Sequence, residues 1–181
     1  MREVLLKTRK FDIERRTLVR PGGREVTREL VVHPGAVVLL PILDDGRIVM
    51  IRNVRHAAGQ ELLELPAGTR EPNESAEATA FRELEEETGY RAERIAPMLE
   101  FYPSPGILTE LMHVFVATGL RPSVQRLQGD EEIVVELHDP HELRRLVVDG
   151  HLRDGKTIAV LATYLLRANS TARPESREAA R

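Results

Sequence analysis

Hydrophobic and polar positions along the chain predict an α/β domain. Residues 36–43 form an almost unbroken apolar run, which is typical of a strand that is buried on both faces. The sequence Asp44-Asp45-Gly46 then signals a hairpin, so residues 48–54 are expected to return as the next strand. The other apolar segments that we interpret as strands are 61–65, 94–101, 111–117 and 133–137.

Three further segments are predicted to be helical. The first begins after Asn73, a residue type that favours the N-cap, and ends at Gly89, which tolerates left-handed backbone. The second covers residues 139–148 and is opened by an Asp-Pro pair. The last covers residues 157–167, whose apolar side chains recur with helical spacing.

The two ends of the chain differ from this central part. Residues 3–32 contain short apolar segments around a turn at Pro21-Gly22-Gly23, which predicts a small β meander. Its apolar content is too low for independent stability, so we expect it to pack on the main domain or on a second subunit. The segment from 169 onward lacks large apolar side chains and is predicted to be disordered. The expected organisation is a meander at 1–34, a main domain at 35–168 and a disordered tail at 169–181.

Composition narrows the class of protein. The chain of 181 residues is 41% hydrophobic and 30% charged, which is ordinary for one globular domain with a small appendage. Its net charge of −3 predicts no general attraction to nucleic acids or anionic membranes. The absence of cysteine excludes disulfides and thiolate metal sites and fits a cytoplasmic protein. Charges interrupt the N-terminal segment where a signal peptide needs an apolar core, and no apolar run reaches the ~18–20 residues of a membrane span.

The first predicted helix carries an unusual run of carboxylates. Glu83 and Glu87 lie one turn apart on a face shared with Ala76 and Ala80, and small apolar residues usually turn a helix face toward the protein. Like charges at this spacing destabilise a helix by about 0.2–0.5 kcal/mol per pair, and only Arg82 adjoins the run. A solvated charged helix is the alternative interpretation. An uncompensated local cost often marks a functional site, however, and clustered carboxylates suit a hard cation such as Mg²⁺.

The stretch that contains this helix resembles the Nudix box, Gly-x5-Glu-x7-Arg-Glu-U-x-Glu-Glu-x-Gly-U, where U is a bulky apolar residue. The matching residues are Gly68, Glu74, Arg82, Glu83, Leu84, Glu86, Glu87 and Gly89. The one departure is Tyr90, an aromatic residue where an aliphatic one is usual. Since that position is expected to pack rather than react, the departure leaves the chemistry intact. So many fixed residues at fixed spacing make the match specific.

Segments on both sides of the box are similar to one branch of the Nudix family, the ADP-ribose pyrophosphatases. Upstream, the resemblance rests on Arg55 and on the sequence Glu-Leu-Pro-Ala-Gly at 64–68. Downstream, a Ser-Pro-Gly loop with Pro105, sixteen residues after the last glycine of the box, is followed by Glu110. Taken singly, the arginine is equally a surface cation, and Ser-Pro-Gly is usually only a turn. The combined resemblance covers about residues 50–137.

The resemblance implies both a fold and a metal site. The fold is the Nudix α/β/α sandwich, in which a mixed sheet lies between helices. The metal ligands would be the carboxylates of Glu83, Glu86 and Glu87 together with the backbone carbonyl of Ala67. The ion would be Mg²⁺, with Mn²⁺ as the alternative.

Catalytic groups are implied in the same way. The general base of this branch resembles a glutamate in a mobile loop outside the box, and here the polar loop 121–130 ends in an acidic run. We choose Glu131 and keep Glu132 in reserve; an acidic loop without a role is the alternative. Arg82 would orient the metal-binding carboxylates and Glu74 would anchor the loop before the helix, unless both are structural partners only.

The resemblance also implies substrate-binding residues outside the box. The guanidinium of Arg55 is suited to the oxygens of a diphosphate. An aromatic side chain of the N-terminal region would stack on adenine, and Phe11 is the only Phe or Tyr there. The full set is Arg55, Glu64, Ser104, Gly106, Glu110 and Phe11.

The function implied is metal-dependent hydrolysis of the diphosphate of ADP-ribose or a related ADP-sugar, giving AMP and a sugar phosphate. Another nucleoside-diphosphate derivative, such as a GDP-sugar or a dinucleotide, is the alternative among enzymes. A regulator that binds a nucleotide sugar without cleaving it is less favoured, because such a module is expected to have lost carboxylates of the box. The expected partner is a small nucleotide sugar, not a nucleic acid or a membrane. The exchange of N-terminal meanders that is common in this branch implies a homodimer.

Overall fold

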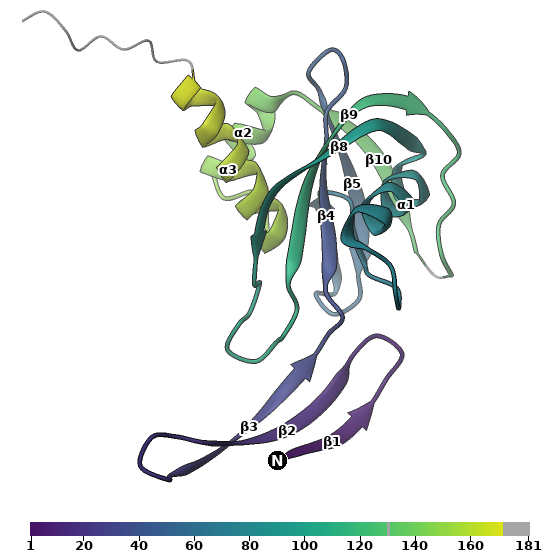
Figure 1. Ribbon diagram of the computed structural model, residues 1–181. Helices are drawn as coiled ribbons and strands as arrows, with labels where there is room; N and C mark the ends of the chain where they lie inside the picture. Colours follow the sequence, from purple (N-terminus) through teal and green to yellow (C-terminus); the bar gives the residue numbers. More distant parts are fainter. Residues whose placement is uncertain (130, 172–181) are drawn as a thin grey trace, which may run out of the picture.

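The chain folds into an α/β domain that carries a three-stranded arm at its N-terminus (Figure 1). The computed structural model describes residues 1–129 and 131–171. In chain order its elements are β1 (Arg2–Lys7), β2 (Asp12–Val19), β3 (Glu25–Val32), β4 (Ala36–Pro41), β5 (Ile48–Arg55), β6 (Gln60–Glu64), β7 (Ala67–Thr69), α1 (Ala76–Thr88), β8 (Tyr90–Phe101), β9 (Met112–Pro122), β10 (Ile133–His138), α2 (Pro140–Val148) and α3 (Gly155–Thr171).

Two sheets lie at the centre of the main domain. One has the strand order β7-β4-β9-β8, in which β4 and β9 are parallel and the other pairs are antiparallel. The second is antiparallel and has the order β10-β5-β6. Helix α1 lies on one side of these strands, and α2 and α3 lie on the other (Figure 1). This arrangement confirms the predicted α/β class with a mixed sheet between helices.

Strand β4 contributes to both hydrophobic cores of the domain. Val38 and Leu40 pack into the core that includes α2 and α3. Val37 and Leu39, which point to the opposite face, pack into the core that includes α1. All four side chains are fully buried. The unbroken apolar run in this segment therefore follows from helices that cover both faces of the strand.

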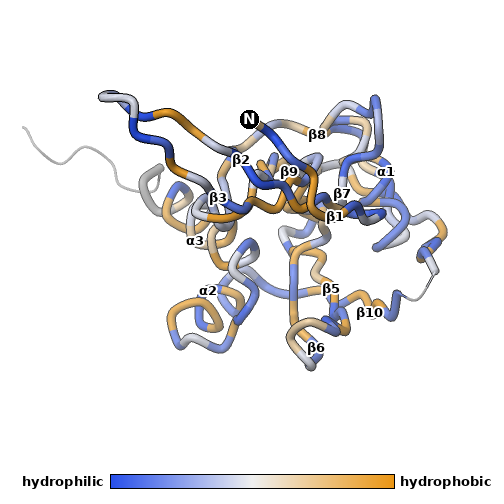
Figure 2. The backbone as a smooth tube through the Cα atoms, turned by 90° about the horizontal axis from the view of Figure 1, so that it is seen from below, coloured by the Kyte–Doolittle hydropathy of each residue, from blue (hydrophilic) through white to orange (hydrophobic). Residues whose placement is uncertain are grey.

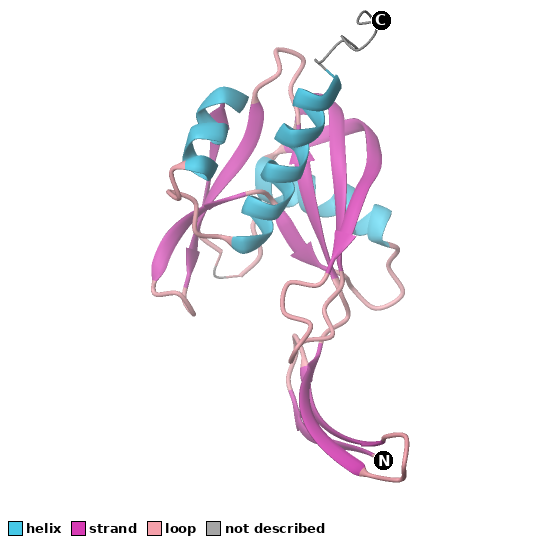
Figure 3. Cartoon of the chain, turned by 90° about the vertical axis from the view of Figure 1, so that its left-hand side faces the viewer, coloured by secondary structure: helices cyan, strands magenta, loops and turns pink. Residues whose placement is uncertain are grey.

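The arm, residues 1–32, is a separate antiparallel sheet with the order β1-β2-β3. It projects away from the main domain (Figures 1 and 3). At its root, the Val31 amide donates to the carbonyl of Ile107 at 2.8 Å, and the Thr109 amide donates to the carbonyl of Val31 at 3.0 Å. The meander is present as predicted, whereas its packing on a second subunit stays a prediction.

Apolar side chains of the arm remain exposed, and its apolar stretches appear as orange segments in Figure 2. They are Val4, Leu5, Leu6, Phe11, Leu18 and Val19. A protein surface that leaves such residues together in water is usually covered by a partner.

The ends of the helices refine the boundaries expected from the sequence. The N-cap of α1 is Ser75, whose hydroxyl accepts from the amide of Ala78, and not Asn73, which adopts a left-handed φ of 65° two residues earlier. Gly89 ends α1 with a φ of 68°, which confirms the predicted left-handed cap. Asp139 caps α2 as predicted.

Helix α3 is longer than predicted and runs through Thr171, into the first residues of the segment interpreted as a tail. The remainder of that segment, 172–181, lies outside the described residues, as does Asp130. Among the described residues, no helix is both long and apolar enough to cross a membrane.

Candidate active site

The acidic face of α1 is turned toward the protein, as its small residues predicted. Glu83 and Glu87 are only 8% and 4% exposed, and Ala80 on the same helix is fully buried. Strand β7, too short to have been recognised as a strand from the sequence, runs past these carboxylates. The amide of Ala67 donates to Oε2 of Glu87 at 2.9 Å. The site therefore lies where the backbone of β7 meets one face of α1.

Burial raises the pKa of both carboxyl groups. For Glu87 the loss of hydration is the largest cause and raises the pKa to about 8, while the hydrogen bond from Ala67 opposes it. For Glu83 the loss of hydration also dominates and is partly offset by Arg82. The hydrogen bonds and positive charges of the chain therefore do not fully offset the loss of hydration at these two carboxylates.

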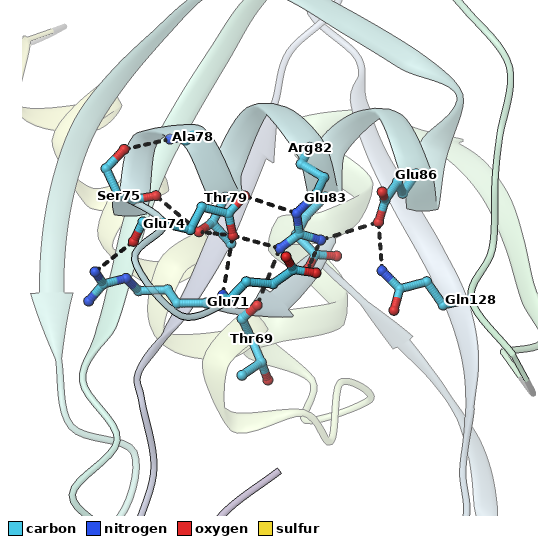
Figure 4. A network of polar contacts seen from close by, with 11 residues as sticks. Thr69, Glu71, Glu74, Ser75, Ala78, Thr79, Arg82, Glu83, Glu86 and Gln128 are labelled. Atoms are coloured by element: carbon cyan, nitrogen blue, oxygen red, sulfur yellow. Dashed lines mark hydrogen bonds and ion pairs between the residues drawn. The ribbon is translucent and has the colours of Figure 1, made fainter. Parts of the chain in front are cut away.

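The side chain of Arg82 bonds to three carboxylates in the polar network on α1 (Figure 4). Its Nε and Nη2 donate to the two carboxylate oxygens of Glu74 at 3.0 and 2.9 Å. Its Nη1 donates to Oε1 of Glu83 at 2.7 Å and to Oε2 of Glu86 at 3.2 Å. One guanidinium therefore contacts three carboxylates, and its predicted role in orienting the metal ligands stays a prediction.

Glu74 anchors the loop that leads into α1. Besides the two bonds from Arg82, its Oε2 accepts from the hydroxyl of Thr79 at 2.8 Å and from the amide of Glu71 at 3.2 Å. The hydrogen bonds from Arg82 are the largest cause that lowers the pKa of Glu74, to about 2. The carboxylate is therefore charged throughout the neutral range and ties loop to helix.

The residues on this face fit a divalent cation. Carboxylate oxygens from Glu83, Glu86 and Glu87 are hard donors, and a cation offsets the burial that raises the pKa of two of them. In the part of the chain that the structure describes, no three acidic or histidine side chains already converge as a finished metal cluster. Arg82 Nη1 bridges two of the carboxylates instead, so the cation would share these oxygens with the guanidinium.

The loop before β10 is fastened to α1. Gln128 donates from its side chain to Oε2 of Glu86 at 2.9 Å, and its backbone amide donates to Oε2 of Glu131 at 2.9 Å. Gln125 donates to the backbone carbonyl of Glu87 at 2.7 Å. The segment that was expected to be mobile is therefore bonded along the helix.

This loop brings one of the two candidate bases to the acidic face. The charge of Glu131 contributes to the raised pKa of both Glu83 and Glu87, which places it within electrostatic reach of them. Both Glu131 and Glu132 are exposed, and Glu132 directly precedes β10. The charge of Glu131 is the one that acts on these two carboxylates, and the role of either residue as the base stays a prediction.

Arg55 and Glu64 form a bidentate ion pair beside the site. Nε and Nη2 of Arg55 donate to the two oxygens of Glu64 at 2.8 and 2.6 Å. Glu64 is fully buried, whereas the Arg55 side chain is 38% exposed and lowers the pKa of Glu87. By contrast, Arg52 pairs with Glu136 on the adjacent strand. Arg55 is therefore close enough to the acidic face to act on Glu87, and its contact with the substrate stays a prediction.

Lys156 is a residue that the sequence interpretation did not single out. Its Nζ contacts the same carboxylate, that of Glu64, from the start of α3. A lone lysine at the start of a helix matches no motif, and 92 residues separate it from its partner. The sequence contained no signal that could have found this contact.

The remaining predicted substrate residues lie elsewhere. Glu110 pairs with His33 at 3.2 Å at the root of the arm, and the carbonyl of Ser104 accepts from the amide of Leu108 at 2.9 Å within its own loop. Gly106 is exposed in that loop, and Phe11 lies in the arm. No polar contact among the described residues joins these four to the carboxylates of α1, so their roles stay predictions.

Comparisons with known proteins agree with this geometry. A family model for the NUDIX domain matches residues 32–161. Over 139 residues the chain is 40% identical to an ADP-ribose pyrophosphatase of Bacillus subtilis (strain 168). The aligned residues are 76% of this chain and 75% of that protein. It is 41% identical over 160 residues to an ADP-ribose pyrophosphatase of Mycobacterium tuberculosis (strain ATCC 25618 / H37Rv), covering 85% and 76%.

A solved structure described as an ADP compounds hydrolase has a TM-score of 0.81 with this chain at 22% identity, over 96% of this chain and 95% of that one. This likeness shows the same fold. The range that the family model matches, residues 32–161, includes the whole box, and the resemblance to the Nudix family is confirmed.

Proposed function

Because the chain belongs to the Nudix family and is a pyrophosphohydrolase, we propose that it hydrolyses ADP-ribose or a related ADP-sugar to AMP and a sugar phosphate. The observation that carries this proposal is the buried acidic face of α1 beside Arg55. Two relatives at 40% and 41% identity carry the name ADP-ribose pyrophosphatase, which supports the choice of nucleotide.

Members of the Nudix family generally need a divalent metal, and here we propose Mg²⁺, with Mn²⁺ as the alternative. The side chains of Glu83, Glu86 and Glu87 and the carbonyl of Ala67 would hold it. When bound, such an ion neutralises phosphate charge and lowers the pKa of a coordinated water. The raised pKa of Glu83 and Glu87 supports a cation at this place.

The chain's own residues bind the substrate and move the proton. Arg55 uses Nε and Nη2 on Glu64, and within the described residues its Nη1 makes no hydrogen bond, so Nη1 is available to a diphosphate oxygen. Glu131 accepts a proton from the attacking water as the water oxygen bonds to phosphorus and the bridging P–O bond breaks. The bridging oxygen leaves with the electron pair of that bond as part of an anionic phosphate monoester, the second proton of the water stays on the newly hydroxylated phosphate, and Glu131 then releases its proton to solvent.

Assembly enters the proposal through the arm. Its exposed apolar side chains and its projection from the domain support a homodimer in which the arm of one subunit covers the other. In that arrangement Phe11 would approach the partner's site, where an aromatic ring would stack on adenine.

A hydrolysis panel tests the proposed substrate. Purified protein is incubated with ADP-ribose, other ADP-sugars, GDP-sugars and dinucleotides, each with Mg²⁺, Mn²⁺ or a chelator, and products are identified by chromatography. We expect AMP and a sugar phosphate from ADP-ribose, the highest kcat/KM for ADP compounds, and no turnover with chelator. Faster cleavage of a GDP-sugar or a dinucleotide would transfer the assignment to that substrate. Binding without cleavage of any compound would establish the regulator alternative.

A further inference from the structure

A buried cation stands at the start of α3, outside the Nudix box. The chain has the lysines Lys7, Lys10 and Lys156, of which the first two are exposed. The side chain of Lys156 is only 9% exposed. Its Nζ contacts Oε2 of Glu64 and lies 2.9 Å from Oδ2 of Asp154. A lysine this well covered is uncommon unless it is paired, and here two carboxylates pair with it.

Glu64 is shared between two cations that come from different parts of the chain. Arg55, at the end of β5, donates to both of its oxygens, and Lys156 donates to Oε2, which it shares with Nη2 of Arg55. Together with Asp154 the group contains two positive and two negative charges. A fully buried carboxylate needs such compensation, because an unpaired buried charge is strongly unfavourable.

The start of α3 also fixes the backbone next to Glu64. The amide of Leu65 donates to the hydroxyl of Thr157 at 2.8 Å, and Thr157 is fully buried. The amide of Thr157 in turn donates to Oδ2 of Asp154 at 3.0 Å. The strand end that carries Glu64 is therefore held by α3 through both its side chain and its backbone.

We propose that Lys156 is a positioning residue for substrate binding: through Glu64 it fixes the orientation in which Arg55 meets the diphosphate. The inference rests on the proposed function and deepens it. Glu64 becomes a positioning residue as well, since both of its oxygens are occupied and its side chain is buried. Within this ion-paired group, Arg55, which is partly exposed, is the residue that touches the diphosphate.

Removing the lysine has a defined consequence. In Lys156→Met, Glu64 keeps Arg55 as its only cation, so its carboxylate loses the second contact on Oε2 that helps to fix its orientation, and the guanidinium bonded to it is free to shift. The affinity for the diphosphate falls, because the orientation of Arg55 determines how well its remaining donors meet phosphate oxygens. Hydrogen bonds to charged groups are strong enough that we expect a loss of about tenfold.

Equilibrium binding and kinetics separate positioning from plain stability. ADP-ribose binding is measured by calorimetry with chelator present, so that no turnover occurs, and KM and kcat are measured with Mg²⁺. Lys156→Met is expected to raise both Kd and KM about tenfold with kcat changed by less than about threefold. Lys156→Arg keeps the charge and is expected to recover most of the affinity. Arg153→Met removes an exposed cation at the same end of α3 and is the matched control.

A double mutant tests whether Lys156 acts through Glu64. In a Glu64→Gln background the shared charge is absent, so adding Lys156→Met is expected to leave Kd unchanged. Melting temperatures of all variants report the fold. A Lys156→Met protein that melts earlier but binds with wild-type Kd and KM would overturn the proposal, as would additive effects in the double mutant.

The wild-type protein is measured first, which keeps two failures apart. If it cleaves a nucleotide sugar other than ADP-ribose, the substrate assignment fails and the same variants are compared on that compound. If it binds and cleaves none, the proposed function and this inference both fail. If it cleaves ADP-ribose and Lys156→Met is silent, only the inference fails.

Discussion

The backbone of Gly68 lies so close to Glu83 that a Cβ atom on the glycine would meet Cδ of the glutamate at 1.9 Å. Gly68 does not adopt a left-handed φ, so backbone conformation is not what requires glycine there. Space requires it, because the carboxylate occupies the volume that a side chain would need. Gly68, the first glycine of the box, therefore leaves the space that the carboxylate of Glu83 occupies.

Gly68→Ala is therefore expected to displace the Glu83 carboxylate. The side chain end can swing away, so we expect a melting temperature near that of wild type and a fall in kcat/KM of about tenfold or more. Gly155→Ala is the control, because a Cβ there meets nothing within 4 Å. Equal activity of Gly68→Ala and wild type would show that the position of Glu83 does not matter for turnover.

Glu83→Gln and Glu87→Gln each remove a ligand charge with little change in shape. We expect each to cut kcat by about a hundredfold or more, because a divalent cation is needed to activate water and neutralise phosphate. Glu77→Gln, on the exposed side of the same helix, is expected to be silent. Steady-state rates at saturating Mg²⁺ decide the matter, and near-wild-type rates for both variants would remove the metal assignment.

Glu131→Gln is expected to lower kcat by about 10²–10⁴-fold with KM nearly unchanged, the signature of a base that acts mainly in the transition state. Glu132→Gln is expected to do less, because Glu132 adjoins β10, whose pleat fixes its direction, whereas the charge of Glu131 acts on Glu83 and Glu87. Rates at several pH values compare the two variants. A silent Glu131→Gln with a crippled Glu132→Gln reverses the roles, and two silent variants place the base elsewhere.

Deletion of the arm, residues 1–32, is expected to give monomers that bind ADP-ribose poorly. The reason is that the arm leaves apolar side chains exposed, which a second subunit would cover, and that it carries Phe11. Light scattering gives the mass of the intact and truncated proteins, and calorimetry gives their affinity. An intact protein that is monomeric at micromolar concentration contradicts the exchange of arms.

Glu74 links stability to pH. Arg82 lowers its pKa from the ordinary 4.5 to about 2, so its charged form stabilises the fold above pH 4.5, and that contribution is lost as the pH falls to about 2. The unfolding free energy of wild type should therefore exceed that of Glu74→Gln at neutral pH, and the gap should narrow through this acid window. Urea unfolding at stepped pH measures it. A gap that stays constant between pH 4.5 and about 2 would disprove the linkage.

The sequence alone determined the elements whose signal is local. Helical spacing places Glu83 and Glu87 on one face whatever surrounds the helix, and the apolar run of β4 identifies a strand covered on both sides. The start of α1 was predicted wrongly, because Asn73 is of a residue type that favours an N-cap. The hydrogen bond from the amide of Ala78 to the hydroxyl of Ser75 shows that Ser75 is the N-cap.

Only the tertiary structure decided which distant segments meet. Lys156 reaches Glu64 across 92 residues, and Gln128 reaches Glu86 across 42. It also decided that the arm stands apart from the main domain, although its strands were foreseen. Local periodicity follows from backbone geometry, which each short segment carries within itself. Contacts between segments depend instead on strand register and on packing summed over the whole domain, and no single residue's neighbours in the chain contain that information.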